Sequence, residues 1–515
     1  MTLRLSNVHQ FIVPTLREMA GLHDLYDAVA VDLSPSSVDK MLLTLGTGDT
    51  PDLDEIESAQ LGNYEEGLRF EYRDLSVHRS NPFVHIDNLD VSCYDREYAP
   101  VEQRTESKVK HLDLWPGLVD TAVATLDRVS APMASAALST LRNLERSVAQ
   151  EPIPEEIKLR STAAIARLKA HLMDFEDPNK NDVPPALGRQ SLERYLGVYD
   201  GVSFSSSEVI SWAESEAKRL GEMLEDGLLR LRSLRKDPEL TVRDLLMEYP
   251  EMHQVYTLAR ETISTARSFV EQRGLLKDVG GICKVGPAPL SRRWAMAMMS
   301  WNAPYEQSAP AMYYITPPSE EFTKEQEAQW MSVFSFTTLP AITVHEAIPG
   351  HFAHGQRLRS SKSEVTKTLL SNAFVEGWAH YGEELMLEEG FMSDDPRFQI
   401  GVAVEALVRI ARVLSTFMQH AEGVTVADAA RVFEDLAHLK GPAAYSEAER
   451  ALFDPTYARY SLGKKVIAKE RDRAKALMGG TFSLGDFHDA LLRYGSPSLG
   501  LVEKITELYI SQSAK

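Results

Sequence analysis

The sequence contains very little cysteine: Cys93 and Cys283 are the only two among 515 residues. Two cysteines are too few for a disulfide framework or a thiolate zinc site, and their separation gives no CxxC pair. We therefore expect two buried free thiols.

Positive charge is also scarce, with 55 Lys and Arg against 75 Asp and Glu and a formal net charge of -20. Nucleic acids and anionic lipid surfaces are recognised largely through clustered Lys and Arg. Neither is expected as a partner of this chain.

Long apolar runs are missing as well. No stretch approaches the roughly eighteen uncharged residues that a membrane span requires. Residues 1–20 show no basic segment followed by an apolar one, the pattern of a secretory leader. The sequence predicts a cytoplasmic protein.

The residues that are present have the composition of a folded protein, 43% hydrophobic and 25% charged. Apolar residues recur at helical spacing over residues 210–234 and 405–420, whereas strand signals are confined to residues 312–316 and 282–285. This pattern predicts a mainly α fold with at most a small β element. Gly and Pro interrupt the helical pattern over residues 274–304.

That interruption suggests an N-terminal helical part, residues 1–275, and a catalytic helical part, residues 276–515, or one continuous domain. Further on, Asp454-Pro455 fits a helix start and Gly479-Gly480 a helix stop. Together they predict one long helix that carries Tyr460 and Arg471.

The segment from His345 to His351 reads HEAIPGH and is the strongest chemical signal. A zinc hydrolase needs imidazole or carboxylate ligands and a nearby carboxylate that takes a proton from water, and His345-Glu346 supplies one of each. In a straight helix His351 would lie roughly 120° around the axis and about 9 Å along it from His345.

Pro349 and Gly350 change this geometry. Pro removes an amide that would bond the carbonyl of His345, and Gly tolerates backbone angles that other residues avoid. We expect a bulge or tight turn that brings His351 back toward His345, after a short helix capped by Thr338. A helix-ending motif with a core histidine is the alternative.

A third ligand is expected from residues 371–386, which have a helical pattern. Phe374, Gly377, Trp378, Tyr381 and Leu385 form an apolar face, and a second face carries Glu376, His380, Glu383 and Glu384. Glu376, flanked by apolar residues, is our candidate. The alternative is an ordinary solvated stripe of charge.

Two further features carry less weight. His354 follows His351 at i,i+3 spacing and is either an alternative ligand or a surface residue. Arg292-Arg293 could hold a substrate carboxylate, although a solvated basic pair is the simpler interpretation.

Three sequence blocks occur in the order H-E-x-x-P-G-H, E-G-W-A and Y-x-x-G: residues 345–351, 376–379 and 460–463. In these blocks the chain resembles the family of domain of unknown function 885, and Arg471 falls where that family's late helix usually has an arginine. The chain departs from the family pattern at residues 454–456, which read DPT in place of P-G-Q, and at His354, where glutamine is frequent.

The resemblance implies a large, helical, gluzincin-like metallopeptidase architecture. It assigns His345, His351 and Glu376 as ligands of one zinc ion and Glu346 as the general base. Tyr460 or His380 could donate to the oxyanion, with Tyr460 favoured by the resemblance; a core tyrosine is the alternative. Arg471 is the candidate substrate-binding residue.

The sequence thus predicts a zinc-dependent hydrolase that cleaves amide bonds of peptides. A metal-dependent amidohydrolase that acts on a small nonpeptide amide is one alternative. The other is a noncatalytic helical peptide-binding protein. Association into a homodimer is left open.

Overall fold

The protein is mainly helical, as the sequence predicts. The computed structural model describes residues 2–49, 52–293, 295–307 and 309–513. Helices make up 69% and strands 3% of the chain. The helices before the sheet are α1 (Leu3–His9), α2 (Val13–Thr15), α3 (His23–Tyr26), α4 (Pro35–Thr44), α5 (Glu55–Arg69), α6 (Val77–Ser80), α7 (Pro82–Asp87), α8 (Val101–Thr125), α9 (Ala131–Gln150), α10 (Glu155–Glu176), α11 (Arg189–Gly197), α12 (Ser206–Arg235), α13 (Val242–Leu246) and α14 (Met252–Arg273).

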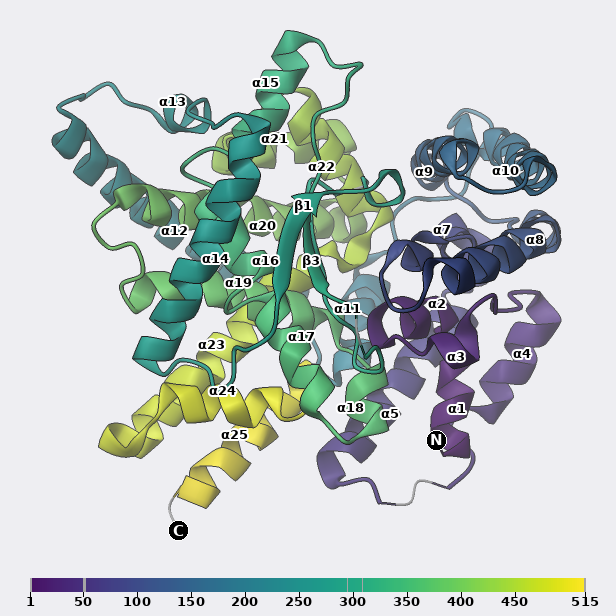
Figure 1. The fold of residues 1–515 in the computed structure, drawn as a ribbon, viewed down its shortest axis with the longest axis horizontal. Coiled ribbons are helices and arrows are strands. Elements are labelled where there is room, and N and C mark those ends of the chain that lie inside the picture. Colours follow the sequence, from purple (N-terminus) through teal and green to yellow (C-terminus); the bar gives the residue numbers. More distant parts are fainter. Residues whose placement is uncertain (1, 50–51, 294, 308, 514–515) are drawn as a thin grey trace.

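The strands and the remaining helices complete the fold (Figure 1). They are β1 (Cys283–Pro287), β2 (Ala297–Ser300), β3 (Ala311–Ile315), α15 (Lys324–Ser332), α16 (Leu339–Glu346), α17 (His351–Ser360), α18 (Glu364–Thr368), α19 (Asn372–Glu388), α20 (Pro396–Glu422), α21 (Val426–Leu436), α22 (Pro442–Phe453), α23 (Arg459–Met478), α24 (Leu484–Leu492) and α25 (Leu499–Ser513). In the view of Figure 1, α8, α9 and α10 lie to the right of the sheet, and α12 and α14 lie to its left.

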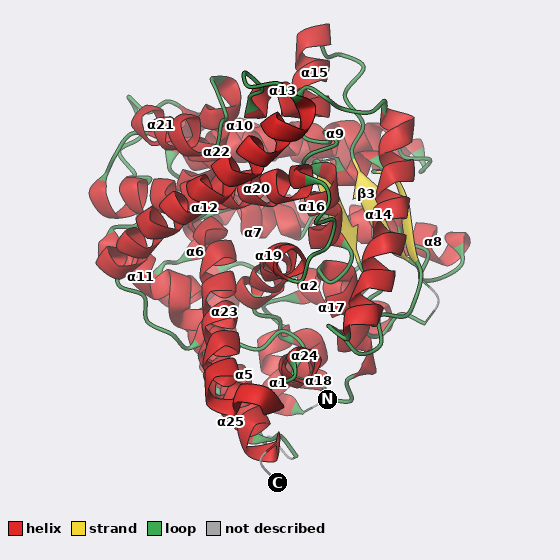
Figure 2. Ribbon diagram, turned by 90° about the vertical axis from the view of Figure 1, so that its left-hand side faces the viewer, coloured by secondary structure: helices red, strands yellow, loops and turns green. Residues whose placement is uncertain are grey.

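The amphipathic patterns over residues 210–234 and 405–420 lie in the long helices α12 and α20, which pack along each other (Figure 2). Leu220 and Leu224 of α12 share an apolar cluster with Leu407 and Ile410 of α20, and all four are nearly inaccessible to solvent. Burial of each leucine or isoleucine contributes about 1.5–3 kcal/mol. Because α20 also contacts α16, α19, α22 and α23, it forms a common support for the elements of the site.

The small β element is a three-stranded sheet in the order β1-β3-β2. β1 pairs parallel to β3, with Cys283 opposite Ala311, and β2 pairs antiparallel to β3, with Ala297 opposite Ile315. The predictions for residues 282–285 and 312–316 are confirmed, but β2 was not expected. Its residues, AMMS, are short and lack the β-branched side chains that mark strands, so only pairing with β3 defines it.

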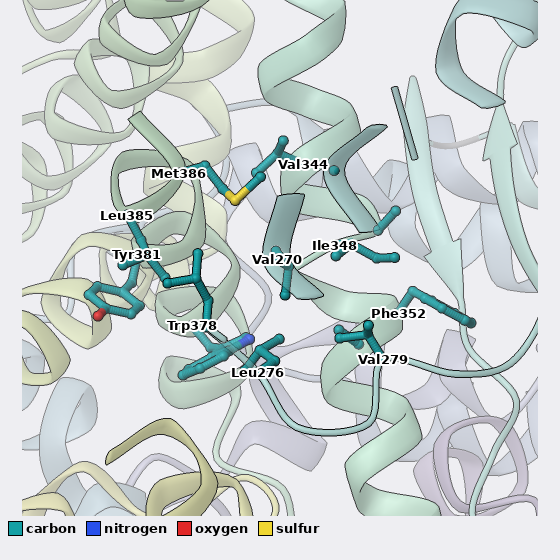
Figure 3. Packing of buried hydrophobic residues seen from close by; sticks show 14 of the residues in the cluster. Val270, Leu276, Val279, Val344, Ile348, Phe352, Trp378, Tyr381, Leu385 and Met386 are labelled. Atoms are coloured by element: carbon teal, nitrogen blue, oxygen red, sulfur yellow. The ribbon is translucent and has the colours of Figure 1, made fainter. Parts of the chain in front are cut away.

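The largest apolar cluster lies around the motif helices (Figure 3). Val344 and Ile348, on either side of the motif's first histidine, are fully buried, as are Phe352 and Trp378. Side chains from α14, α16, α17 and α19 meet in this cluster. Dense packing here restricts how the backbone around the motif can move.

Two predicted helix caps are wrong. Asp454 does not cap the long helix: a 3-10 turn at Pro455–Ala458 comes first, and the Asp454 carboxylate instead accepts a hydrogen bond from the Thr456 hydroxyl at 2.6 Å. Thr338 occupies the cap position of α16, but its hydroxyl donates to the carbonyl of Val333. The predicted stop is confirmed, since α23 ends at Met478, directly before Gly479.

Apolar clusters include residues from both sides of residue 275; one combines α14 with α16 and α19. The division into residues 1–275 and 276–515 stays a prediction. In the described part of the chain, no helix has both the length and the apolar character needed to cross a bilayer.

Candidate metal centre

The HEAIPGH segment is two helices joined by a tight turn. α16 ends at Glu346, α17 begins at His351, and the peptide bond between Ile348 and Pro349 is cis. Gly350 is required for this turn: a Cβ atom there would lie 1.7 Å from the carbonyl oxygen of His345. The expected break in the helix at Pro349-Gly350 is therefore present.

The turn brings three candidate ligands together. The Nε2 atoms of His345 and His351 lie 3.6 and 3.7 Å from the same oxygen, Oε2 of Glu376 on α19. One ligand atom from each of the three residues falls within 4.8 Å of the others. Two imidazoles and a carboxylate with an open fourth position are the donor set of catalytic zinc sites, so these residues fit that ion.

His345 is oriented from behind by a charged pair. Its Nδ1 lies 2.7 Å from Oε1 of Glu383, and Arg409 of α20 donates to the other oxygen of Glu383 at 3.1 Å. A proton on Nδ1 that bonds Glu383 leaves Nε2 as the acceptor that faces Glu376. Glu383 is fully buried, so the alternative of a solvated charge stripe is wrong for this helix.

The charges of the cluster are coupled. Burial alone would lower the pKa of His345, but hydrogen bonding to Glu376 and Glu383 raises it to about 9. Burial likewise would raise the pKa of Glu376, and the two histidines lower it well below its ordinary value. The cluster therefore favours ionised carboxylate ligands.

Glu346 lies beside the three candidate ligands without being one of them. Its side chain is 7% exposed, and Oε2 has no hydrogen-bond partner among the described residues. Burial raises its pKa, an effect that His351 and His345 oppose. The β2 residue Met299 approaches the same carboxylate through its backbone amide. A buried carboxylate with an unused oxygen is suited to accept a proton.

Tyr460 lies near the cluster at the start of α23. Burial and the nearby Glu376 carboxylate raise the pKa of Tyr460 above its ordinary value, and its hydroxyl makes no hydrogen bond to a described residue. His380 is buried on α19, with Nδ1 3.7 Å from Glu383. Burial, together with Lys464, lowers the pKa of His380 to about 3, so this imidazole is neutral at pH 7.

Arg471 lies away from the cluster. It pairs with Glu388 at 2.5 Å near the end of α19, about 18 Å along the helix axis from Glu376. Its guanidinium also lies 5.4 Å from the ring of Tyr381. The structure thus does not bring Arg471 together with the other predicted site residues.

Three weaker expectations need correction. His354 is neither a ligand nor exposed: it is fully buried, with Nε2 3.0 Å from the carbonyl of Gly495. Arg292 is not solvated but forms a partly buried ion pair with Glu18 at 2.9 Å, whereas Arg293 is exposed as expected. Cys283 is only half-buried because it lies in the outer strand β1, while Cys93 is buried as expected.

The second and third sequence blocks hold the site together. Trp378 of α19 donates its indole N–H to the carbonyl of Pro349 at 2.9 Å, which connects α19 to the turn. A Cβ atom on Gly377 would lie 2.5 Å from the backbone of Gly463 on α23. The two glycines allow the backbones of α19 and α23 to come close, which fixes both Glu376 and Tyr460.

The fold and the site together define a mainly helical protein with a His-His-Glu cluster. Residues 44–505 match the family described as bacterial protein of unknown function (DUF885), so the chain belongs to this family. No curated protein sequence matches the chain.

Two solved structures have the same fold. One is a "putative lipoprotein of unknown function" from Shewanella oneidensis, with 18% identity, a TM-score of 0.73, and 98% of this chain and 99% of that chain covered. The other is described as "the putative lipoprotein from Colwellia psychrerythraea". It has 16% identity and a TM-score of 0.75, with 99% of this chain and 98% of that chain covered.

Proposed function

We propose that this protein is a zinc-dependent hydrolase that cleaves amide bonds of peptides. The observation that carries the proposal is the grouping of His345, His351 and Glu376 within 4.8 Å, with the buried Glu346 carboxylate beside them. A zinc ion held by the three residues would supply Lewis acidity and a water whose pKa is lowered to about 7.

The side chains around the cluster transfer the proton, stabilise the oxyanion and orient His345. Glu346 accepts the proton of the attacking water and passes it to the leaving amine, as its unpaired oxygen permits. Tyr460, whose raised pKa keeps it protonated, donates a hydrogen bond to the oxyanion. Glu383 keeps His345 in the tautomer that binds through Nε2.

The test combines metal analysis with Glu346→Gln. We expect near-stoichiometric zinc in both the native protein and the variant, peptide cleavage by the native protein, and turnover at least about 100-fold lower in the variant. Native protein depleted of metal by a chelator is the control, and zinc should restore its activity.

Other outcomes would point elsewhere. Absence of zinc after gentle purification would favour a noncatalytic peptide-binding protein, and cleavage of small amides but not peptides would favour an amidohydrolase. Cytoplasmic location stays a prediction from the sequence, and association into a homodimer stays open. The lipoprotein names of the two structural relatives suggest an anchored protein as the alternative location.

A further inference from the structure

The basic side chains around the metal cluster are almost all paired with acids. Arg409 donates to Glu383 at 3.1 Å, and Lys464 binds Glu384. These charges are neutralised inside the protein and are not free to bind a substrate.

Arg450 of α22 is the exception next to Tyr460. Its guanidinium forms a loose ion pair with Asp454 at 3.7 Å and makes no hydrogen bond to a described residue, and its side chain is 42% exposed. By contrast, the neighbouring Arg412 of α20 binds Glu447 through two nitrogens, at 2.9 and 3.3 Å. Arg450 therefore keeps donors available for an incoming anion.

The ring of Tyr457 fixes the position of Arg450. The guanidinium carbon of Arg450 lies 4.0 Å from the ring centre, and that of Arg412 lies 4.1 Å from it. The Tyr457 hydroxyl donates to Glu447 at 3.0 Å, which keeps the ring in place. Stacking on an aromatic ring leaves the edge of a guanidinium free for hydrogen bonds in its plane.

Tyr457 also connects Arg450 to the metal cluster. The rings of Tyr457 and Tyr460 are 5.7 Å apart. Burial and the nearby Glu376 carboxylate raise the pKa of Tyr460, an effect that the nearby Arg450 guanidinium opposes. The substrate residue that follows a carbonyl at Tyr460 extends only about 3.5 Å. The terminal carboxylate of that residue would therefore lie close to Arg450.

We propose that Arg450 binds the terminal carboxylate of a peptide substrate, so that the enzyme removes residues from the C-terminal end. This specificity rests on the proposed function. A guanidinium fork matches a carboxylate with two parallel hydrogen bonds, whereas a terminal amide offers one neutral acceptor. On a chain of net charge -20, a local cation is also needed to offset repulsion of an anionic group.

The test measures binding without turnover. An N-acetylated dipeptide with a free C-terminal carboxylate, and the same dipeptide with a carboxamide, are titrated calorimetrically into zinc-supplemented Glu346→Gln protein. We expect the acid to bind about tenfold or more tightly than the amide. Adding Arg450→Gln should remove this difference while leaving binding of the amide unchanged.

Arg431→Gln serves as the matched control, since Arg431 lies on α21 with a side chain that is 73% exposed. It should preserve the preference for the acid. Equal affinity for acid and amide in the parent protein, no binding of either, or a preference that survives Arg450→Gln would overturn the proposal. A failure of the proposed function appears separately, as missing zinc or missing hydrolysis by the native protein.

Discussion

Single residues decide which nitrogen of His345 is available. Nδ1 is bound to Glu383, and Glu383 is itself bound to Arg409, so the ring can turn neither way without breaking a buried charged contact. Carboxylates behind metal-binding histidines fix ring orientation and raise ligand basicity. The helical pattern in the sequence places Glu383 on the polar face but indicates no role for it, and no local pattern points to Arg409.

Glu383→Gln tests this arrangement. We expect zinc affinity to fall by about 10- to 100-fold, because the neutral amide stabilises the Nδ1 proton less than a carboxylate does and cannot balance Arg409. Competition with a chromophoric chelator measures the affinity. Glu388→Gln, on the exposed end of the same helix, is the control and should leave zinc affinity unchanged. Equal affinities for the native protein and Glu383→Gln would contradict the assigned role.

At the level of elements, the site depends on how closely two helices approach. α19 supplies Glu376 and α23 supplies Tyr460, and the helices touch where Gly377 faces Gly463. A Cβ atom on Gly463 would lie 1.9 Å from the carbonyl oxygen of Ala373. The glycines of the second and third sequence blocks are thus explained by packing.

Gly463→Ala should therefore destabilise the protein by about 1–3 kcal/mol, because backbone atoms must move to admit the methyl group. The thermal unfolding midpoint should fall accordingly. Gly221→Ala is the matched control: it lies within α12 with nothing near its Cβ position, and it should leave stability unchanged or raise it by up to about 1 kcal/mol. The interpretation fails if both alanine variants unfold at the native midpoint.

Over the whole molecule, a partly buried ionic network joins the N-terminal segment around Glu18 to the sheet region. Glu18 binds Arg292 at 2.9 Å and Arg96 at 3.3 Å, and Arg96 also binds Glu306 at 2.6 Å. Burial would raise the pKa of Glu18, but Arg292 and Arg96 lower it to about 2. The network holds segments that are far apart in sequence.

Because the folded-state pKa of Glu18 is lower than its ordinary 4.5, its contribution to stability is present above pH 4.5 and is lost as pH falls toward about 2. Glu18→Gln should cost on the order of 3 kcal/mol at pH 7. The gap in unfolding midpoint between native protein and variant should narrow between pH 4.5 and pH 2. A gap that stays constant over this range would argue against the ionic role.

The sequence by itself determined the helical class, two of the three strands and the residues of the candidate metal cluster. These follow from local chemistry: apolar spacing marks helices, and a proline-glycine pair breaks a helix wherever it occurs. Glu376 and the helix break at Pro349-Gly350 were predicted from residue properties, and the resemblance added Tyr460 to the same site.

Only the tertiary structure decided which partners these residues have. Glu383 could be solvated or buried until α20 placed Arg409 against it, and Arg450 gains its position from a ring on another element. For the same reason, local sequence patterns did not indicate the partners of His354, Arg292 and Arg471. Burial and ion pairing depend on segments distant in sequence, which local periodicity does not encode.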